Sequence, residues 1–376
     1  MQPAFSVGAV FSEIHSLPAE IHPRQDCLSH PPPPNPHPVR FSSLSSPLLT
    51  LLTLSSLLPS LSAFKIFIDG SAGTTGLQVR DRLKNRPEIT LIDPPDDMRK
   101  DEETRKSFML KSDCTILCLP DSASEDSARW LTESGNTNTV LIDASTAFRV
   151  SPDFTYGFAE LCPEQKDAIK SSKRISNPGC YPTGFISLTR PLVEAGILRE
   201  GRALTVNAIS GYSGGGKQLM EIHEAGEAEP WGAYGFNLNH KHLPEMALYS
   251  KLNRKPIFQP QVGSFPQGMV VSVPLHYEGM DGASGVKIHE ALREWYKDSQ
   301  FVEVMELEST SHLERGAFLR PDTLANSNKM ELFVFANDEE EQCVLCARLD
   351  NLGKGASGAA VQNMNLALGL DEAEGL

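Results

Sequence analysis

The stretch FKIFIDGSAGTTGLQVRDRLKNR, residues 64–86, determines the fold class of this chain. A short apolar run enters a glycine-rich turn, and a helical pattern follows the turn at once. Glycines let the backbone approach a pyrophosphate, and a helix that starts there offers unpaired N–H groups and the positive end of its dipole. The stretch therefore predicts the first strand, turn and helix of a dinucleotide-binding domain. The predicted pyrophosphate contacts are Gly70, Ser71, Gly73, Thr74, Thr75 and Gly76.

The same alternation of strands and helices continues along the chain. The segments ITLIDPP (89–95), CTILCLP (114–120) and TVLIDAST (139–146) have the apolar runs of buried strands. The segment SASEDSARWLTES (122–134) has helical spacing. Alternation of this kind predicts a doubly wound parallel sheet, the Rossmann architecture.

The residues after the second predicted strand are compatible with either of two cofactors, NAD or NADP. Asp93 stands where a carboxylate would bind the ribose 2′-hydroxyl of NAD. Arg99, Lys100 and Arg105 follow, and a basic cluster there would bind the 2′-phosphate of NADP. A solvent-exposed charged loop is the structural alternative.

The segment SNPGCYPTG (176–184) places Cys180 between a turn and a predicted helix. A thiol at a helix N-terminus has a lowered pKa, and the thiolate is the nucleophilic form. We therefore expect Cys180 to be an accessible nucleophile rather than a structural cysteine. Cys114 and Cys118 differ from it, because both stand in an apolar predicted strand.

A catalytic thiol needs a proton partner, and the segment NHKHLPEM (239–246) supplies the candidates. If this segment is extended, His240 and His242 face the same side. One of them would act as the acid/base, and the other would support it or contact substrate. Glu245 is a candidate carboxylate to orient them, and a pair of surface histidines is the structural alternative.

A second glycine-rich turn, GYSGGGK (211–217), follows the predicted strand LTVNAIS (204–210). Its backbone N–H groups and Lys217 suit an anion or a closely approaching ligand. A flexible linker would have a similar sequence.

Composition restricts the class of protein. The 376 residues are 40% hydrophobic, enough for a sizeable core and two domains. A formal net charge of −14 without a basic stripe argues against nucleic acid and favours a small-molecule partner. The seven cysteines lack the spacing of a disulfide framework, which indicates reduced thiols. Cys343 and Cys346 form a lone CxxC without a second ligand pair, so we expect a core strand and no metal site.

Residues 1–63 have the composition of a targeting leader. The segment HPPPPNPHPVR (30–40) cannot form helix or sheet, and an apolar run follows at 46–64. The run is too short and too rich in Ser, Thr and Pro for stable membrane insertion, and we expect cleavage near Ala63. Its Ser-Ala-Phe junction resembles bipartite leaders of algal complex plastids, so a plastid is the expected location. Mitochondrion and cytoplasm are the alternatives, and a disordered tail is the structural one.

A nucleotide fold, an activated thiol and a histidine together indicate an oxidoreductase acting on an aldehyde or an acyl phosphate. The thiolate would displace phosphate to form a thioester. NAD(P)H would reduce this thioester to a thiohemiacetal, whose collapse releases the aldehyde.

The segments described above resemble the N-acetyl-gamma-glutamyl-phosphate reductase family, in its shorter subtype. SNPGCYPTG is similar to the family's active-site signature. Other segments resemble the family in the same order: GSAGTTG, RKDEETR, LPDSASE, DASTAFR, SGYSGGGK, HKHLPEM and DNLGKGASGAAVQNMN. The resemblance covers residues 64–376. It implies NADPH-dependent reduction of N-acetyl-L-glutamyl 5-phosphate to N-acetyl-L-glutamate 5-semialdehyde in arginine biosynthesis.

By position, the resemblance implies a role for each matched residue. Cys180 is the nucleophile. Either His240 or His242 is the acid/base, and the resemblance does not decide which one. Phe148 departs from the family, which often has His there. The implied contacts of the cofactor 2′-phosphate are Arg99 and Lys100, and Asn351 is a further implied cofactor contact. The implied substrate or nicotinamide contacts are Ser145, Arg149, Gly214 and Lys217.

The resemblance also implies the domain organisation. A Rossmann domain spans 64–179 and is completed by a C-terminal helix in 352–376, and an α+β catalytic and dimerisation domain spans 180–351. Strand patterns at 267–277, 301–307, 331–337 and 343–349, with an amphipathic helix at 284–296, agree with the second domain. Members of the family form homodimers or homotetramers.

Two other functions are alternatives. Aspartate-semialdehyde dehydrogenase shares the fold and the thiol chemistry, but it surrounds its cysteine with Asn, Thr or Ser rather than with PGCYPTG. A catalytically inactive dinucleotide-binding sensor would have lost Cys180 or the two histidines, and all three are present. A redox protein using Cys343 and Cys346 would need those thiols at a helix start, and they stand in a predicted strand.

Overall fold

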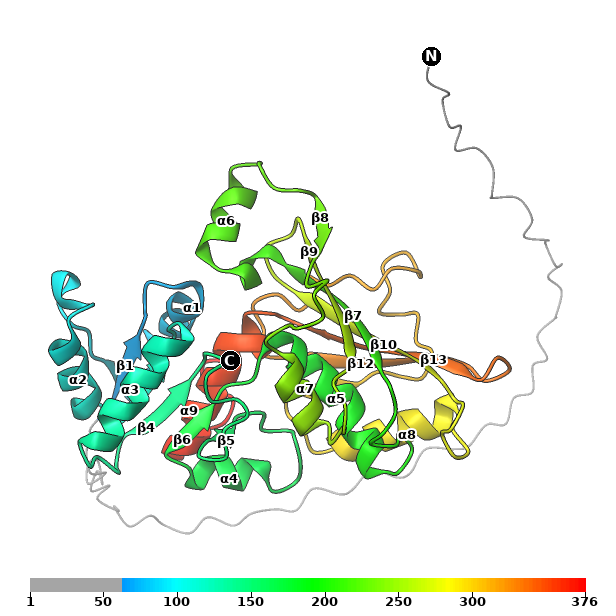
Figure 1. Ribbon diagram of the computed structural model, residues 1–376, viewed down its shortest axis with the longest axis horizontal. Coiled ribbons are helices and arrows are strands. Elements are labelled where there is room, and N and C mark those ends of the chain that lie inside the picture. The colour runs from blue at the N-terminus through cyan, green and yellow to red at the C-terminus, as the bar shows by residue number, and fades with distance from the viewer. Residues whose placement is uncertain (1–62) are drawn as a thin grey trace, which may run out of the picture. The chain divides into compact units, whose positions relative to one another are not determined.

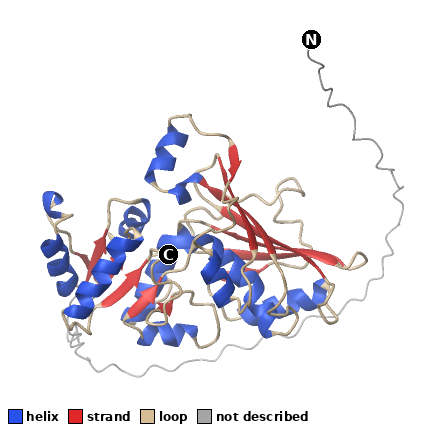
Figure 2. Ribbon diagram, in the orientation of Figure 1, coloured by secondary structure: helices blue, strands red, loops and turns tan. Residues whose placement is uncertain are grey.

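The computed structural model describes residues 63–376, which belong to one compact unit spanning 58–376. The predicted leader lies outside the described residues, except for Ala63. The described chain forms one parallel sheet and one mixed sheet, with helices packed on both (Figures 1 and 2). None of the helices within 63–376 has the length and apolar character needed to cross a membrane.

The first sheet is the predicted parallel sheet. Its strand order is β2-β1-β3-β4-β6-β5, and all neighbouring pairs are parallel. The direction of the strand order reverses between β1 and β3. At this point a crevice forms at the carboxyl ends of the strands, and sheets of this kind bind ligands in that crevice. The strands are β1 (Phe64–Asp69), β2 (Ile89–Leu91), β3 (Cys114–Leu117), β4 (Val140–Asp143), β5 (Thr155–Tyr156) and β6 (Arg174–Ser176).

Both faces of this sheet are covered, because successive side chains of a strand point to opposite sides. Ile66 and Ile68 of β1 pack with α1, α4 and α9, whereas Phe67 packs with α2 and α3. The C-terminal helix α9 therefore completes the layer on one face (Figure 1). The helices are α1 (Thr74–Leu83), α2 (Glu102–Lys111), α3 (Asp121–Glu133), α4 (Gln165–Ser171) and α9 (Gly358–Leu368).

The second sheet is mixed, with the order β11-β12-β13-β10-β7-β9-β8. Its strands are β7 (Thr205–Gly211), β8 (Trp231–Ala233), β9 (Ile257–Gly263), β10 (Met269–His276), β11 (Val302–Val304), β12 (Met330–Asn337) and β13 (Gln342–Leu349). Cys343 and Cys346 are buried in β13, which confirms the prediction of a core strand.

Three helices cover one face of the mixed sheet (Figure 1). They are α5 (Cys180–Glu194), α7 (Leu243–Tyr249) and α8 (Gly285–Tyr296). The largest apolar core lies between these helices and the strands, with Phe185 of α5 and Ile288 of α8 fully buried in it. The helix α6 (Lys217–Glu224) has no fully buried residue and projects from the mixed sheet.

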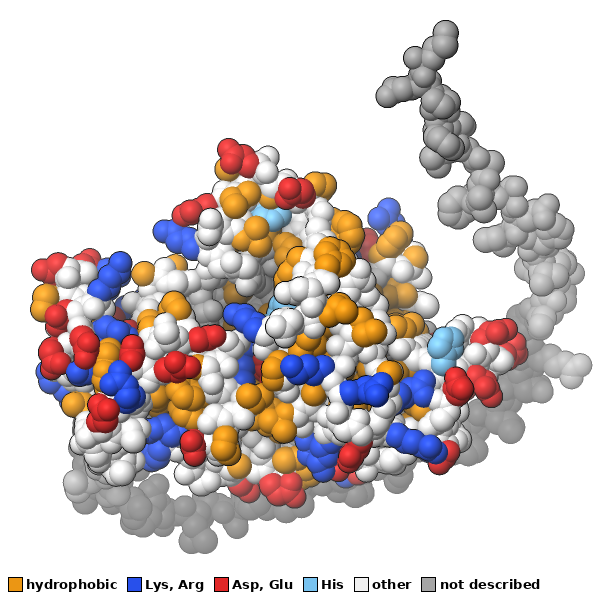
Figure 3. Space-filling view, viewed as in Figure 1, with side chains coloured by type: hydrophobic (Ala, Val, Ile, Leu, Met, Phe, Trp, Pro, Cys, Tyr) orange, Lys and Arg blue, Asp and Glu red, His pale blue; other side chains and the backbone are white. Residues whose placement is uncertain are grey.

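Short helical segments complete the description. The 3₁₀ segments η1 (Asp96–Met98) and η2 (Tyr212–Gly215) lie in loops, and the π-helical segment η3 (Gly353–Ser357) leads directly into α9. On the face seen in Figure 3, acidic and basic side chains are interspersed over the surface. Among residues 63–376, no group of three or more His, Cys, Asp and Glu side chains is arranged to hold a metal ion.

Candidate active site

Cys180 is the first residue of α5, where the preceding turn joins the two sheets. Gly179 before it is extended (φ −73°, ψ 151°), and no side chain caps the helix. The first N–H groups of α5 therefore face the region of the sulfur without a side-chain partner. Gly179 has no room for a side chain, because a Cβ would lie 2.6 Å from Arg149 Nη1, 2.8 Å from Glu245 Oε1 and 2.9 Å from His242 Nε2. The fold thus brings the turn before Cys180 against candidate side chains from distant segments.

Glu245 organises this turn. Its buried carboxylate accepts hydrogen bonds from Arg149 Nη1 (2.8 Å), from the Tyr156 hydroxyl (2.8 Å) and from the backbone N–H of Gly179 (3.1 Å). The sequence predicted that Glu245 orients a histidine. Among the described residues, its carboxylate makes no hydrogen bond to either histidine, so this prediction is wrong. Glu245 instead holds Arg149 and the residue before Cys180.

Arg149 is buried and lines the cleft, and its guanidinium donates several hydrogen bonds. Besides the bond to Glu245, it donates to the backbone oxygens of Asn177 (3.0 Å) and Ala144 (3.2 Å). Tyr156, which sequence reasoning missed, stacks on Tyr249 with ring centroids 3.6 Å apart. A tyrosine in a two-residue strand carried no signal that its hydroxyl would donate to Glu245.

The two histidines do not lie on an extended strand. Pro244 stands in the first turn of α7, and proline there favours a helix start. His240 and His242 therefore sit in the turn that enters α7, where His240 Nδ1 accepts the backbone N–H of His242 (3.2 Å). The rings still lie close, with centroids 4.7 Å apart and planes at 72°. His242 is buried, and its Nδ1 has no hydrogen-bond partner within 63–376.

Burial controls the protonation of this site. Burial raises the pKa of Cys180 to about 11, although the positive charge of Arg149 and a hydrogen bond from the Tyr181 N–H both lower it. The sequence predicted a lowered thiol pKa from the helix position. That prediction is wrong for the free protein, because desolvation of the thiolate outweighs the helix N-terminus.

The imidazoles are neutral at physiological pH. Burial lowers the pKa of His242 well below its usual range, and the charges of Arg149, His240 and Lys241 lower it further. Burial and the charge of Lys241 lower the pKa of His240 to about 4. A neutral imidazole beside a thiol can accept the proton that the thiol must lose.

A cleft of about 990 Å³ connects Cys180 to the glycine-rich turn after β1. Gly70 in this turn has φ +86°, and a Cβ would lie 2.3 Å from the Cys118 carbonyl oxygen, so only glycine fits. The extended residue Gly73 begins α1 without a side-chain cap, and the first turn has no acidic residue. These free N–H groups fit the pyrophosphate of a dinucleotide.

The structure brings ten of the predicted site residues to the wall of this cleft: Gly73, Thr74, Thr75, Arg149, Cys180, Gly214, Lys217, His240, His242 and Asn351. Asn351 ties the wall together, since its side chain accepts the Gly268 N–H (2.8 Å) and donates to Ser213 Oγ (3.0 Å). Ser145 does not line the cleft, because its hydroxyl is bonded to the buried carboxylate of Asp143 (2.7 Å). The remaining predicted contacts lie outside this wall: Gly70, Ser71, Gly76, Arg99 and Lys100.

Two of the basic residues predicted after β2 form ion pairs with different carboxylates. Arg105 donates to the buried carboxylate of Asp69 at the end of β1 (2.9 Å), so it supports the sheet rather than a ligand. Arg99 pairs with Asp96 in η1. Asp93 pairs with Arg80 of α1, a residue that sequence reasoning did not single out.

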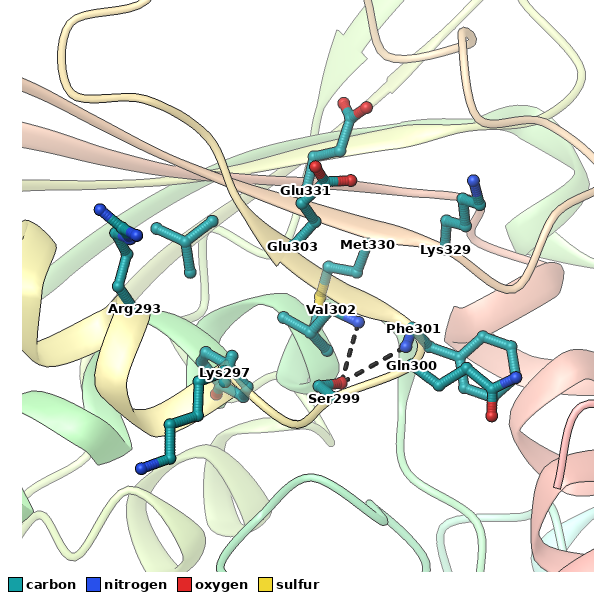
Figure 4. A pocket seen from close by; sticks show the side chains of 12 residues that line it. Arg293, Lys297, Ser299, Gln300, Phe301, Val302, Glu303, Lys329, Met330 and Glu331 are labelled. Carbon is teal, nitrogen blue, oxygen red and sulfur yellow. Dashed lines mark hydrogen bonds between the residues drawn. The ribbon is translucent and has the colours of Figure 1, made fainter. Parts of the chain in front are cut away.

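A second, smaller cleft of about 390 Å³ lies between α8 and the strands β11 and β12 (Figure 4). Arg293 of α8 and Lys297, which directly follows α8, stand on one side of it, and Lys329 stands on another. Ser299 Oγ accepts the backbone N–H groups of Phe301 and Val302 at its base. None of the predicted site residues lines this cleft.

A parallel sheet with a glycine-rich turn, a mixed sheet and a cysteine at the start of the helix between them indicate an oxidoreductase. The family model described as "Semialdehyde dehydrogenase, NAD binding domain" matches residues 71–169, and the one described as "Semialdehyde dehydrogenase, dimerisation domain" matches residues 180–351. N-acetyl-gamma-glutamyl-phosphate reductases of Brucella ovis and Brucella abortus (strain S19) are each 47% identical to this chain over 311 residues, covering 81% of it and 99% of each relative. The chain therefore belongs to the semialdehyde dehydrogenase family, on its N-acetyl-gamma-glutamyl-phosphate reductase branch.

Solved structures share the fold. Aspartate semialdehyde dehydrogenase II from Vibrio cholerae matches with a TM-score of 0.61 and 16% identity, covering 82% of this chain and 98% of that one. The enzyme from Candida albicans, solved with NADP, matches with a TM-score of 0.58 and 15% identity, covering 81% and 99%. Identities this low show the fold alone, and they confirm the predicted fold class.

Proposed function

We propose that this chain is an NADPH-dependent N-acetyl-gamma-glutamyl-phosphate reductase. It reduces N-acetyl-L-glutamyl 5-phosphate to N-acetyl-L-glutamate 5-semialdehyde and releases phosphate. The observation that carries the proposal is the placement of Cys180 at the start of α5, in the same cleft as neutral His242 and the glycine-rich turn. The named Brucella relatives support the choice of substrate.

The first step is loss of the thiol proton. With the Cys180 pKa at about 11, little thiolate exists at neutral pH, and neutral His242, whose Nε2 lies beside the preceding Gly179, is the proposed proton acceptor. The charge of Arg149 and the N–H groups of α5 stabilise the sulfur as it becomes negative. The thiolate then forms a C–S bond to the acyl carbon, and phosphate leaves with the electrons of the C–O bond.

The second half of the reaction regenerates the site. When bound, the cofactor supplies the hydride that turns the thioester into a thiohemiacetal. The imidazolium of His242 gives its proton to the carbonyl oxygen as negative charge develops there. His242 removes that proton again as the C–S bond breaks, so the aldehyde leaves and the Cys180 thiolate re-forms.

The turn after β1 and the open start of α1 would hold the cofactor pyrophosphate, as the fit of Gly70 and Gly73 indicates. We assign the NADP 2′-phosphate to the charged loop after β2 together with Arg80 of α1. Lys100 is exposed, and Arg99 and Arg80 have only solvent-accessible carboxylate partners. In this assignment Asp93 serves to orient Arg80 rather than to bind ribose.

The test is turnover by the full chain in the oxidative direction. NADP⁺ reduction is followed with N-acetylglutamate semialdehyde and phosphate, and aspartate semialdehyde is assayed in parallel. Activity on the acetylated aldehyde alone, abolished by iodoacetamide, supports the proposal. Activity on aspartate semialdehyde would make the chain an aspartate-semialdehyde dehydrogenase. Binding of NADPH without turnover of either aldehyde would favour the inactive sensor.

Two further assignments belong to this proposal. We propose a homodimer or homotetramer assembled through residues 180–351, supported by the match to a dimerisation domain, and light scattering on the purified chain tests it. We propose that residues 1–63 direct the chain to a plastid, supported by the apolar run and the Ser-Ala-Phe junction. Imaging of a fluorescent fusion to residues 1–63 tests this location.

A further inference from the structure

One of the cations that line the cleft beside Cys180 has no carboxylate partner among residues 63–376. Within residues 63–376, the Lys and Arg side chains that line it are Arg149, Lys217 and Lys241. Arg149 is neutralised by the buried carboxylate of Glu245 at 2.8 Å. Lys217 lies 3.7 Å from the Glu221 carboxylate. Among the described residues, no carboxylate lies within ion-pair distance of Lys241.

Lys241 stands between His240 and His242, in the turn that enters α7. It is exposed to solvent at the wall of the cleft, so its ammonium group is accessible to a ligand. Its charge acts on both imidazoles, because it contributes to the lowered pKa of His240 and of His242. Lys241 also lines the same cleft as His240 and His242.

The Asp121 carboxylate, which does not line the cleft, makes no ion pair with Lys241 among the described residues. Asp121, the first residue of α3, is close enough for the charge of Lys241 to lower its pKa, although hydrogen bonds from Thr146 have the larger lowering effect and burial opposes both. The Asp121 carboxylate accepts the Thr146 N–H at 2.9 Å and the Thr146 hydroxyl at 2.5 Å. It is therefore committed to its own domain, and the ammonium group remains available.

The proposed substrate brings two oxyanions into this cleft, a carboxylate at one end and an acyl phosphate at the other. An oxyanion that loses water on binding needs a cationic or N–H partner, and an ammonium group supplies three donors. We propose that Lys241 binds an oxyanion of the substrate, its carboxylate or its phosphate, on the His240–His242 side of the cleft. This inference rests on the proposed function, since it assigns a contact to that substrate.

The oxidative reaction separates the two candidate groups, because the carboxylate is then on the semialdehyde and phosphate is a second, free substrate. Lys241→Met removes the charge and keeps the stem, Lys241→Arg keeps the charge, and Lys170→Met is the control. Lys170 is 53% exposed on α4 and pairs with Asp167, so it changes the net charge equally at a distance from the cleft. NADPH binding, measured by fluorescence, checks that each variant is folded.

We expect Lys241→Met to raise the KM of one substrate about 10–100-fold, the range for loss of one charge-assisted hydrogen bond. Lys241→Arg should recover most of this loss, and Lys170→Met should match the unsubstituted chain. A raised KM for semialdehyde assigns Lys241 to the carboxylate, and a raised KM for phosphate assigns it to the leaving group. Unchanged KM values for both would overturn the inference, even if kcat fell.

A measurement without turnover separates the inference from the proposed function. Inorganic phosphate and N-acetylglutamate are each tested for slowing the alkylation of Cys180 by iodoacetamide. Protection by either anion that disappears in Lys241→Met supports the oxyanion site, and protection that persists in the variant contradicts it. If the unsubstituted chain turned over neither aldehyde, the proposed function would fail. If the unsubstituted chain were active and the Lys241 variants had the same KM values and the same protection by anions, only this inference would fail.

Discussion

Replacing Glu245 with glutamine tests the account of the active-site turn. The side chain is 1% exposed, and its carboxylate receives three hydrogen bonds, from Arg149, Tyr156 and the Gly179 N–H. Glutamine has nearly the same shape but no charge, and one of its two terminal atoms is a donor. The variant therefore leaves the buried guanidinium without a counter-charge and places an NH₂ group against at least one existing donor.

The expected loss of stability is large for a single polar substitution. Breaking a buried ion pair by removing one partner costs about 3–5 kcal/mol. At about 2 °C per kcal/mol for a chain of this size, Tm falls by about 6–10 °C. The matched control is Glu294→Gln on α8, whose carboxylate is 74% exposed and pairs with Lys297. An exposed pair of this kind contributes about 0–1 kcal/mol, so the control should shift Tm by about 2 °C or less.

The assay is thermal unfolding of the full chain, monitored by circular dichroism, together with the rate of Cys180 alkylation. Glu245→Gln should unfold at the lower temperature, and its alkylation rate should differ from that of the control, because the turn before the thiol loses an anchor. If Glu245→Gln and Glu294→Gln have the same Tm, Glu245 does not hold the turn, and the reasoning from its three hydrogen bonds is refuted.

Four further outcomes follow from the site. Cys180→Ser should lower turnover at least about a thousandfold and leave NADPH affinity unchanged, since the thiol and the glycine-rich turn have separate roles; loss of NADPH binding would contradict this separation. Because burial raises the Cys180 pKa to about 11, alkylation of the free protein should accelerate steadily from pH 7 to 9, and a plateau below pH 8 would mean a lowered pKa. Arg99→Ala and Arg80→Ala should each raise the Kd of NADPH about tenfold and that of NADH little, whereas equal losses would return Asp93 to the role of ribose contact. Burial lowers the His240 pKa from 6.5 to about 4, so the unfolded state binds more protons and stability falls as pH drops through this interval; His240→Asn should reduce that dependence in unfolding measured at pH 4.5 and 7.

Local sequence patterns were sufficient for the architecture. The apolar run, turn and helix at 64–86 predicted β1 and α1, and strand–helix alternation predicted the parallel sheet that the structure contains. The segment around Cys180 likewise predicted a thiol at the start of α5. Such features are readable because turn chemistry and hydrophobic periodicity act over a few neighbouring residues.

The electrostatics of the site depended on residues far apart in the chain. Glu245 meets Gly179 and Tyr156 only because α7, α5 and β5 pack together, and no local pattern states that contact. The helix position of Cys180 predicted a lowered thiol pKa, but desolvation by the surrounding protein opposes the charged form more strongly than the helix N-terminus favours it. Local propensity therefore determined the elements and the place of Cys180 at a helix start, while burial and long-range packing determined the protonation of its thiol, the neighbours of its turn and the open position of Lys241.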